Sequence, residues 1–409
     1  MLELAVIGAW AEFAVRWLHV ITAIAWIGSS FYFIALDLGL RKSPDLPAGA
    51  YGEEWQVHGG GFYHIQKYLV APDRLPDHLI WHKWQSYVTW LSGFALLALV
   101  YYVGAEFYLI DANVMDLAVW QAIAISIASL AVGWVIYDLL CKSRLGDNND
   151  RLMALLFVLL VIMAWGYTQV FTGRAALLHL GAFTATIMSA NVFMIIIPNQ
   201  KIVVADLRAG RTPDAKYGRI AKQRSTHNNY LTLPVIFLML SNHYPLAFAS
   251  EYNWLIAGLV FLMGVTIRHF FNTMHMGGGY KWWTWAATTV LFLAIIWLST
   301  LGQPGDDDPS LASLPPAAAR FADDPHFDDI YWTVVGHCSM CHAQDPVWPG
   351  LYWAPKGVVL ETEAQVARAA QSIYLQSGIS HAMPPGNTVL MDSTARNQIA
   401  QWYRRASGS

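Results

Sequence analysis

The 409-residue sequence has few charged side chains and few cysteines. Only 13% of the residues are charged, whereas 56% are hydrophobic and 19 are tryptophan. This balance excludes an ordinary soluble globular protein, in which about a quarter of the residues are charged. The sequence also has no convincing internal repeat. No cleavable signal peptide is evident, so the first apolar run is expected to act as a membrane anchor.

Long apolar runs recur instead. Each matches the roughly 20 helical residues that cross a bilayer core of about 30 Å. We expect eight transmembrane helices, at residues 12–36, 84–105, 117–140, 151–172, 174–197, 229–250, 252–272 and 281–300. The run at 229–250 is the least regular, because it contains two prolines and a polar patch.

Positive charges are distributed unevenly between the predicted loops. Loops 37–83, 141–151, 198–228 and 273–281 hold 5, 3, 7 and 1 Lys and Arg, and the opposite loops hold only Arg174. The positive-inside rule places the first set of loops in the cytoplasm. Both termini then lie outside, as in a multi-pass protein of a bacterial inner membrane.

Two of the three cysteines lie in the stretch VVGHCSMCHAQ. Cys338, Cys341 and His342 form C-x-x-C-H, the spacing for covalent attachment of a c-type haem. The thiols bond to the haem vinyl groups, and the adjacent His binds the iron from one face. The alternative interpretation is a redox or zinc C-x-x-C followed by a chance His.

A second axial ligand is expected downstream of the motif. Met383, which precedes two prolines in HAMPPGN, is the first candidate, and Met340 and Met391 are weaker ones. His/Met ligation is typical of an electron-transfer haem rather than one that binds O₂.

These observations predict an all-α chain: an eight-helix transmembrane bundle followed by a small α-helical class I cytochrome c domain. Residues 1–300 form the transmembrane domain, 301–323 a Pro/Gly/Asp linker, and 324–409 a periplasmic cytochrome c domain. The remaining cysteine, Cys141, is expected to be a free thiol near the cytoplasmic interface.

Three histidines are predicted at similar depths in the outer half of the bundle. His19, His179 and His243 lie there, with Arg16 and Arg174 close by. This grouping favours a bound b-type haem or metal, with imidazole ligands and arginines near the propionates. The alternative is a set of hydrogen-bonded contacts between helices.

The cytoplasmic side has its own pattern. EEWQVHGGGFYHIQKY (53–68) and HMGGGYKWW (275–283) each combine His, a Gly triplet, aromatic residues and Lys. Such a composition suits a flat, anionic, nitrogen-rich ligand, because glycine permits close approach, aromatic rings stack and Lys supplies charge. The alternative is an interfacial aromatic belt. The candidate catalytic residues are His58, His64, Lys67 and His82.

Several long motifs resemble one family. RWLHVITAIAWIGSSFYFIALD, GEEWQVHGGGFYHIQKY, WHKWQSY, LSNHYP and HMGGGYKWWTW, followed by a C-terminal C-x-x-C-H, are similar to the membrane-bound bacterial urate oxidases, also called urate hydroxylases. The first of these also resembles the first span of membrane protoporphyrinogen oxidases, in which a His is associated with haem.

The resemblance implies oxidation of urate to 5-hydroxyisourate in purine catabolism. It implies haem c on Cys338, Cys341, His342 and Met383, and electrons passing to a terminal oxidase or a soluble cytochrome. Nucleic acid is not expected among the partners. Other classes stay open: a quinol-linked electron-transfer cytochrome without its own substrate, a redox-gated transporter, or a porphyrin enzyme.

The side of the membrane from which urate enters decides whether an intermediate redox centre is needed. From the cytoplasmic face, electrons must cross about 30 Å of bilayer, so an intermediate centre at His19, His179 and His243 is expected. A cation such as Lys67 then offsets the charge of urate, and a neutral His acts as base. From the outer face no such centre is required, and the outer histidines become candidates for the urate site itself.

Overall fold

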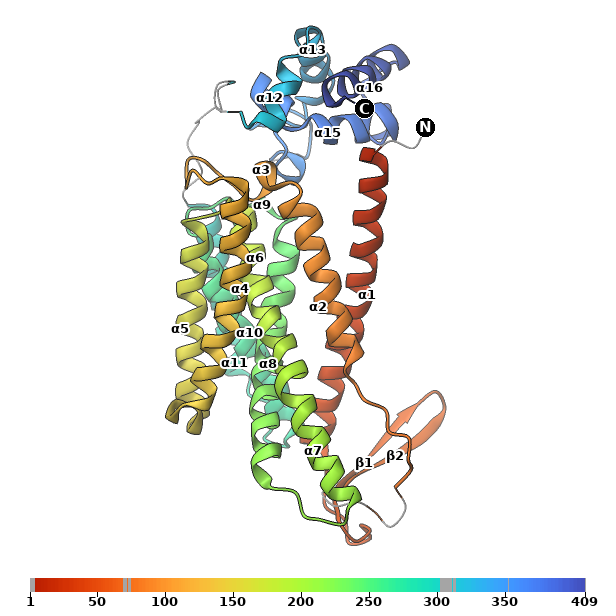
Figure 1. Cartoon of the computed structure of the whole chain (residues 1–409), viewed down its shortest axis with the longest axis vertical. Helices are drawn as coiled ribbons and strands as arrows, with labels where there is room; N and C mark the ends of the chain where they lie inside the picture. Colours follow the sequence, from red (N-terminus) through yellow and green to blue (C-terminus); the bar gives the residue numbers. More distant parts are fainter. Residues whose placement is uncertain are drawn as a thin grey trace.

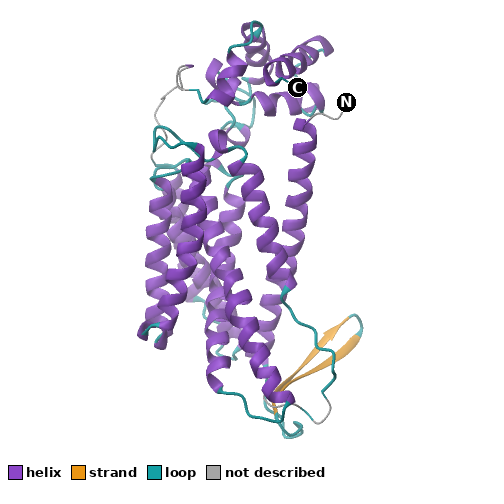
Figure 2. Ribbon diagram, in the orientation of Figure 1, coloured by secondary structure: helices purple, strands orange, loops and turns teal. Residues whose placement is uncertain are grey.

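The computed structural model describes residues 4–408 except 69–71, 73–74, 302–310, 312–313 and 352. The described chain is mostly helical. Long helices lie side by side, a group of shorter helices covers one end, and a two-stranded hairpin projects at the other end (Figures 1 and 2).

The long helices carry two π-helical turns. Among the described residues they are α1 Leu4–Gly39, α2 Trp84–Leu97, α4 Val119–Lys142, α5 Asn149–Thr168, α6 Gly173–Ala190, α7 Ile197–Arg208, α8 Ala215–Ser241, α10 Asn253–His275 and α11 Trp283–Ser299. The π-turns η1 Ala98–Tyr102 and η3 Asn191–Ile196 continue α2 and α6. Short helices α3 Ala105–Tyr108, η2 Arg144–Asp147 and α9 Pro245–Phe248 lie between them.

The predicted apolar runs all fall on these helices. Five helical stretches are long and apolar enough to cross a membrane: Leu4–Gly39, Val119–Lys142, Asn149–Thr168, Gly173–Arg208 and Asn253–His275. The runs at 84–105, 229–250 and 281–300 correspond to α2 with η1, the second half of α8 with α9, and the shorter α11. That all eight cross a bilayer stays a prediction.

Residues 50–68 contradict the expectation of an entirely helical chain. β1 Ala50–His58 and β2 Gly61–Tyr68 form an antiparallel hairpin. Trp, Val, Phe, Tyr and Ile favour strands. Gly59 and Gly60 occupy left-handed conformations at the turn, with φ of 60° and 78°, which glycine adopts without a steric penalty. The Gly triplet therefore turns a hairpin.

The C-terminal residues form a series of short helices. They are α12 Pro316–Ala322, α13 Phe327–Cys338, η5 Pro355–Gly357, α14 Glu363–Arg368, α15 Ala370–Ile373, η6 Tyr374–Ile379, η7 Pro385–Asn387 and α16 Ser393–Ser407. Helix α12 lies within the predicted linker but belongs to this core, since the buried Trp402 donates its indole N–H to the Phe321 carbonyl at 3.0 Å. The rest of the linker, at 302–310 and 312–313, lies outside the described residues.

The packing of α4 on α6 depends on Gly133. A Cβ added there would lie 1.9 Å from the ring of Phe183, which is fully buried. We therefore expect Gly133→Ala to lower the unfolding free energy by about 1–3 kcal/mol, the usual cost of overpacking. Gly166→Ala on α5 is the control, because a Cβ there meets nothing within 4 Å. Thermal unfolding of both detergent-solubilised variants tests this, and equal midpoints would contradict the packing.

Candidate functional site

One cavity lies at the end of the bundle that carries the hairpin. This hairpin-side cavity has a volume of about 510 Å³ and is lined by α1, β2, residues 80–82, η3, α7 and α8. Lys67 and His82 both line it, as two of the four predicted catalytic residues. The Lys67 ammonium donates to Asp37 Oδ1 at 2.6 Å, and the His82 ring packs edge-on against Phe33 at 4.8 Å.

The other two predicted residues lie elsewhere on the hairpin. His58 is exposed at the end of β1. The strand register puts His64 opposite Trp55, and the two rings stack at 4.1 Å. His64 Nε2 lies 2.6 Å from Glu53 Oε2, and this hydrogen bond lowers the pKa of the Glu53 carboxyl. Neither histidine lines the hairpin-side cavity.

A second cavity lies toward the end that carries the C-terminal helices. This domain-side cavity has a volume of about 230 Å³. Arg16 and His19 from α1, Arg174 from α6 and His243 after α8 all line it. Two guanidinium groups and two imidazoles therefore meet in an otherwise mostly apolar space. Trp90 and Phe94, stacked at 5.5 Å, form an aromatic wall.

His19 is held in one orientation by α2. Its Nδ1 lies 3.0 Å from the Thr89 carbonyl oxygen and 3.1 Å from Ser92 Oγ. A carbonyl only accepts hydrogen bonds, so Nδ1 carries the proton and Nε2 is left as a basic nitrogen. The ring fits closely over Gly93, where an added Cβ would lie 2.9 Å from His19 Cε1.

Three buried polar atoms of residues that line this cavity have no hydrogen-bond partner among the described residues. They are Arg174 Nε, a donor, Asn242 Oδ1, an acceptor, and the Tyr101 hydroxyl, which can do either. Leaving a buried donor or acceptor unpaired costs about 1–3 kcal/mol, so such atoms call for a missing partner. A ligand with both an acceptor and an N–H or O–H donor would satisfy them.

The third histidine of the predicted outer group lies outside this cavity. His179 is fully buried, and its ring nitrogens are 2.8 Å from Ser126 Oγ and from the Ala175 carbonyl oxygen. Both nitrogens are therefore occupied in helix contacts, which was the alternative interpretation.

The haem or metal expected within the bundle is not tested by the structure and stays a prediction. A volume of about 230 Å³ lies below the range of about 300–1,000 Å³ typical of cofactor sites. No group of three or more His, Cys, Asp or Glu in the described part of the chain is placed to hold a metal ion. The cavity therefore suits a ligand smaller than a haem.

The C-x-x-C-H residues lie at the end of α13 and in the turn that follows. Cys338 is the last residue of α13, and the His342 N–H donates to its carbonyl at 2.8 Å. His342 Nδ1 lies 2.8 Å from the Val358 carbonyl oxygen. This is the arrangement that orients a metal-binding His and leaves Nε2 available.

The environment of the Cys338 thiol differs from that of a redox-active C-x-x-C motif. Burial, with a smaller contribution from the neighbouring Cys341 thiol, raises the pKa of Cys338 to about 11. Redox-active C-x-x-C motifs lower this pKa instead. A structural zinc site needs four ligands, and the described residues provide no such cluster.

The Met383 loop is held by a buried arginine. Arg396 donates to the Met383 carbonyl at 2.8 Å and to the Ser377 carbonyl at 2.9 Å. Of the two weaker candidates, Met391 is buried in the domain core and Met340 is 40% exposed. Met383 therefore stays the best candidate for the second axial ligand.

The C-terminal domain contacts the bundle beside the domain-side cavity. Gly357 lies against Pro245, since a Cβ on it would be 3.1 Å from Pro245 Cγ. Lys356 is near enough to act electrostatically on His243. The carbonyl oxygen of Val358, the residue after Gly357, lies 2.8 Å from His342 Nδ1 and orients its ring. One short segment therefore joins the predicted haem ligand to the wall of the cavity.

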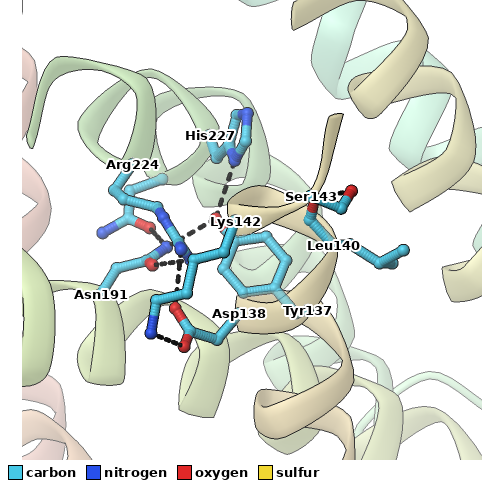
Figure 3. A network of polar contacts seen from close by, with 9 residues as sticks. Tyr137, Asp138, Leu140, Lys142, Ser143, Asn191, Arg224 and His227 are labelled. Atoms are coloured by element: carbon cyan, nitrogen blue, oxygen red, sulfur yellow. Dashed lines mark hydrogen bonds and ion pairs between the residues drawn. The ribbon is translucent and has the colours of Figure 1, made fainter. Parts of the chain in front are cut away.

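A buried polar network lies between α4, η3 and α8 (Figure 3). Arg224 is almost fully buried and donates to Asp138 at 2.7 Å and to Asn191 at 3.2 Å. Tyr137 bonds to His227 at 2.7 Å. Asn191 also donates to Asn228, which lines the hairpin-side cavity. The network balances the charge of Arg224 within the bundle.

Sequence reasoning did not single out Asn242, Gly93 or Trp26 as site residues. Asn242 lies in LSNHYP, where a polar residue in an apolar run was the available signal. No pattern marks Gly93 or Trp26, because their roles arise only when α2 packs on α1.

Comparison with known proteins gives one family. Residues 5–299 match the model of the family described as "Urate oxidase N-terminal". No match was found among curated proteins or among solved structures.

The Arg224–Asp138 pair yields a stability prediction. Asp138→Asn leaves a buried guanidinium without its carboxylate, and we expect a loss of about 3 kcal/mol of unfolding free energy. Asp138 also pairs with the exposed Lys142 at 2.6 Å. Lys142→Gln is therefore the control, with an expected loss of about 0–1 kcal/mol. Thermal unfolding midpoints compare the two, and similar shifts would show that Arg224 does not depend on Asp138.

Proposed function

The chain belongs to the urate oxidase N-terminal family, and from this premise we propose that it is a membrane-bound urate oxidase. It converts urate to 5-hydroxyisourate, and the electrons leave through a covalently bound c-type haem in the C-terminal domain. The observation that carries the proposal is the domain-side cavity, which holds two arginines, two histidines and an unpaired donor and acceptor beside the C-terminal domain.

The size and chemistry of this cavity suit urate. Urate at neutral pH is a planar monoanion with several carbonyl oxygens and ring N–H groups. Arg174 Nε would donate to an oxygen or a deprotonated ring nitrogen, and Asn242 Oδ1 would accept a ring N–H. The stacked Trp90 and Phe94 offer an aromatic face for the purine ring.

The chain's residues divide the reaction between binding and proton removal. Overall, uric acid and one water give 5-hydroxyisourate, two electrons and two protons. The urate monoanion has already lost one proton, so its oxidation releases only one. Arg174 and Arg16 bind the anion, although Arg16 also pairs with Glu12. His19 Nε2 accepts the ring or water proton, while Thr89 and Ser92 keep its ring in place. The oxygen of water adds at C5 of the oxidised ring.

The C-terminal residues fit the group that receives the electrons. Cys338 and Cys341 would form the thioether bonds, His342 Nε2 and the Met383 sulfur would bind the iron, and Val358 and Arg396 would keep these ligands oriented. A haem held there supplies one-electron acceptance, so two successive transfers complete each oxidation.

This placement differs from the sequence-based expectation of a urate site at His58, His64, Lys67 and His82. Oxidation in the domain-side cavity places substrate and acceptor on the same side of the bundle. No additional redox centre is then required. We propose that this side faces the periplasm of a bacterial inner membrane, because the positively charged loops lie at the hairpin end. A terminal oxidase or soluble cytochrome would receive the electrons.

Urate itself is expected to reduce the haem. The purified oxidised protein in detergent is mixed anaerobically with urate, and its optical difference spectrum is followed while urate is assayed. A c-type α-band that rises as urate disappears supports the proposal. A haem that stays oxidised with urate but is reduced by quinol would instead favour an electron-transfer cytochrome without a substrate of its own.

Arg174 is expected to be needed for urate binding. Arg174→Gln removes a charged hydrogen bond worth about 1.5–3 kcal/mol, so kcat/KM for urate should fall about 10- to 100-fold. Arg151→Gln, at an exposed position on α5, is the control. Dithionite reduction of the haem should be the same in both variants. An unchanged kcat/KM in Arg174→Gln would show that urate does not bind in this cavity.

Two matched variants test the assignment of Met383 as the second axial ligand. Met383→Ala should lower the reduction potential with the haem still attached, because loss of Met ligation removes the ligand that raises it. Met391→Leu should keep the potential, since Met391 lies in the core. Redox titration of both full-length proteins measures this, and a lowered potential only in Met391→Leu would reverse the assignment.

A further inference from the structure

The two cavities share two walls, α1 and α8, and their other walls are neighbouring elements. Elsewhere, α2 and α6 line the domain-side cavity, whereas residues 80–82 before α2, and η3 and α7 after α6, line the hairpin-side cavity. Along both shared helices the domain-side residues lie nearer one end and the hairpin-side residues nearer the other. The cavities therefore follow one another along the bundle and adjoin at one shared lining residue, Trp26.

Helix α1 shows this arrangement most directly. Its lining residues include His19, Trp26, Ser30, Phe33 and Asp37. Steps of three, four or seven residues keep these side chains on one face of a helix. Polar side chains thus line this face on both sides of Trp26.

Trp26 is the point at which the two cavities meet. It lines both of them and is partly buried against the bundle core. On the opposite wall, Thr186 lines the domain-side cavity and Val192 lines the hairpin-side cavity. The π-turn η3 begins at Asn191, between these positions, and such turns often occur at functional sites.

We infer that the hairpin-side cavity is a second urate site, through which substrate from the hairpin end reaches the domain-side cavity past the Trp26 indole. This inference rests on the proposed function and adds its route of access. The oxidising site is the narrower space at the far end, and Trp26 separates it from the open chamber.

The chemistry of the hairpin-side cavity fits a purine anion held less tightly. Its cation, Lys67, is 42% exposed and shared with Asp37, so an arriving anion competes for a solvated ammonium. Gln66, Gln200 and Asn228 line the same cavity and offer amide donors and acceptors. The domain-side cavity instead has two arginines and unpaired buried atoms, so binding should strengthen along the path.

A cavity-filling variant tests the route. Ser30→Trp adds an indole to the hairpin-side cavity at a position that does not line the domain-side cavity. Stopped-flow reduction of the haem at low urate should slow at least tenfold, while dithionite reduction stays unchanged. Ile24→Trp is the matched control, because Ile24 is 66% exposed and lines neither cavity. Equal urate-dependent rates in the two variants would overturn the route.

Sidedness gives an independent test with the wild-type protein. Sealed inverted membrane vesicles present the hairpin end to the medium, and right-side-out vesicles present the C-terminal domain. Added urate should reduce the haem promptly in inverted vesicles and slowly in right-side-out ones. Prompt reduction only in right-side-out vesicles would overturn the route and leave urate oxidation standing. Absence of reduction in both, and in detergent, would overturn the proposed function itself.

Discussion

The arrangement of the bundle depends on the high cost of leaving a polar group unpaired in an apolar interior. Most buried polar side chains here meet that constraint locally. His179 bonds to Ser126 and its own helix, and Arg224 bonds to Asp138 and Asn191. The domain-side cavity keeps Arg174 Nε, Asn242 Oδ1 and the Tyr101 hydroxyl unpaired beside an oriented histidine, and Arg224 Nε and His227 Nε2 in the buried network also lack a partner among the described residues. The two arginines and the oriented histidine around an open space are what distinguish the domain-side cavity from these helix contacts.

The same constraint explains why the three histidines predicted in the outer half of the bundle do not share one site. Sequence depth placed His19, His179 and His243 together, and depth alone cannot say which way a side chain points. Rotation of α6 turns His179 into the core between α4 and α6. The packing of α1 over Gly93 holds the His19 ring against α2. Two residues of one predicted group therefore share a cavity, and the third serves the fold.

The position of the C-terminal domain changes the electron-transfer problem. A urate site at the hairpin end would lie a bilayer's width from the haem motif and would need a further carrier. The segment 355–358 instead contacts Pro245 and holds His342, so the cavity beneath it lies beside the predicted acceptor. Separating access at one end from oxidation at the other assigns a role to both cavities and explains why their linings differ in charge and size.

Local patterns in the sequence predict the long helices, the uneven distribution of positive loops, the C-x-x-C-H turn and the Met383 loop, since each is carried by residues close together in the chain. The resemblance to urate oxidases likewise depends on contiguous motifs, and the family match agrees with it. The hairpin at residues 50–68 was missed, because a Gly triplet among aromatic residues is equally compatible with a binding loop. Only the tertiary structure decides which polar residues meet. The two cavities, their shared Trp26 and the exclusion of His179 arise from helix rotation and from contacts between residues more than fifty positions apart, which no local pattern encodes.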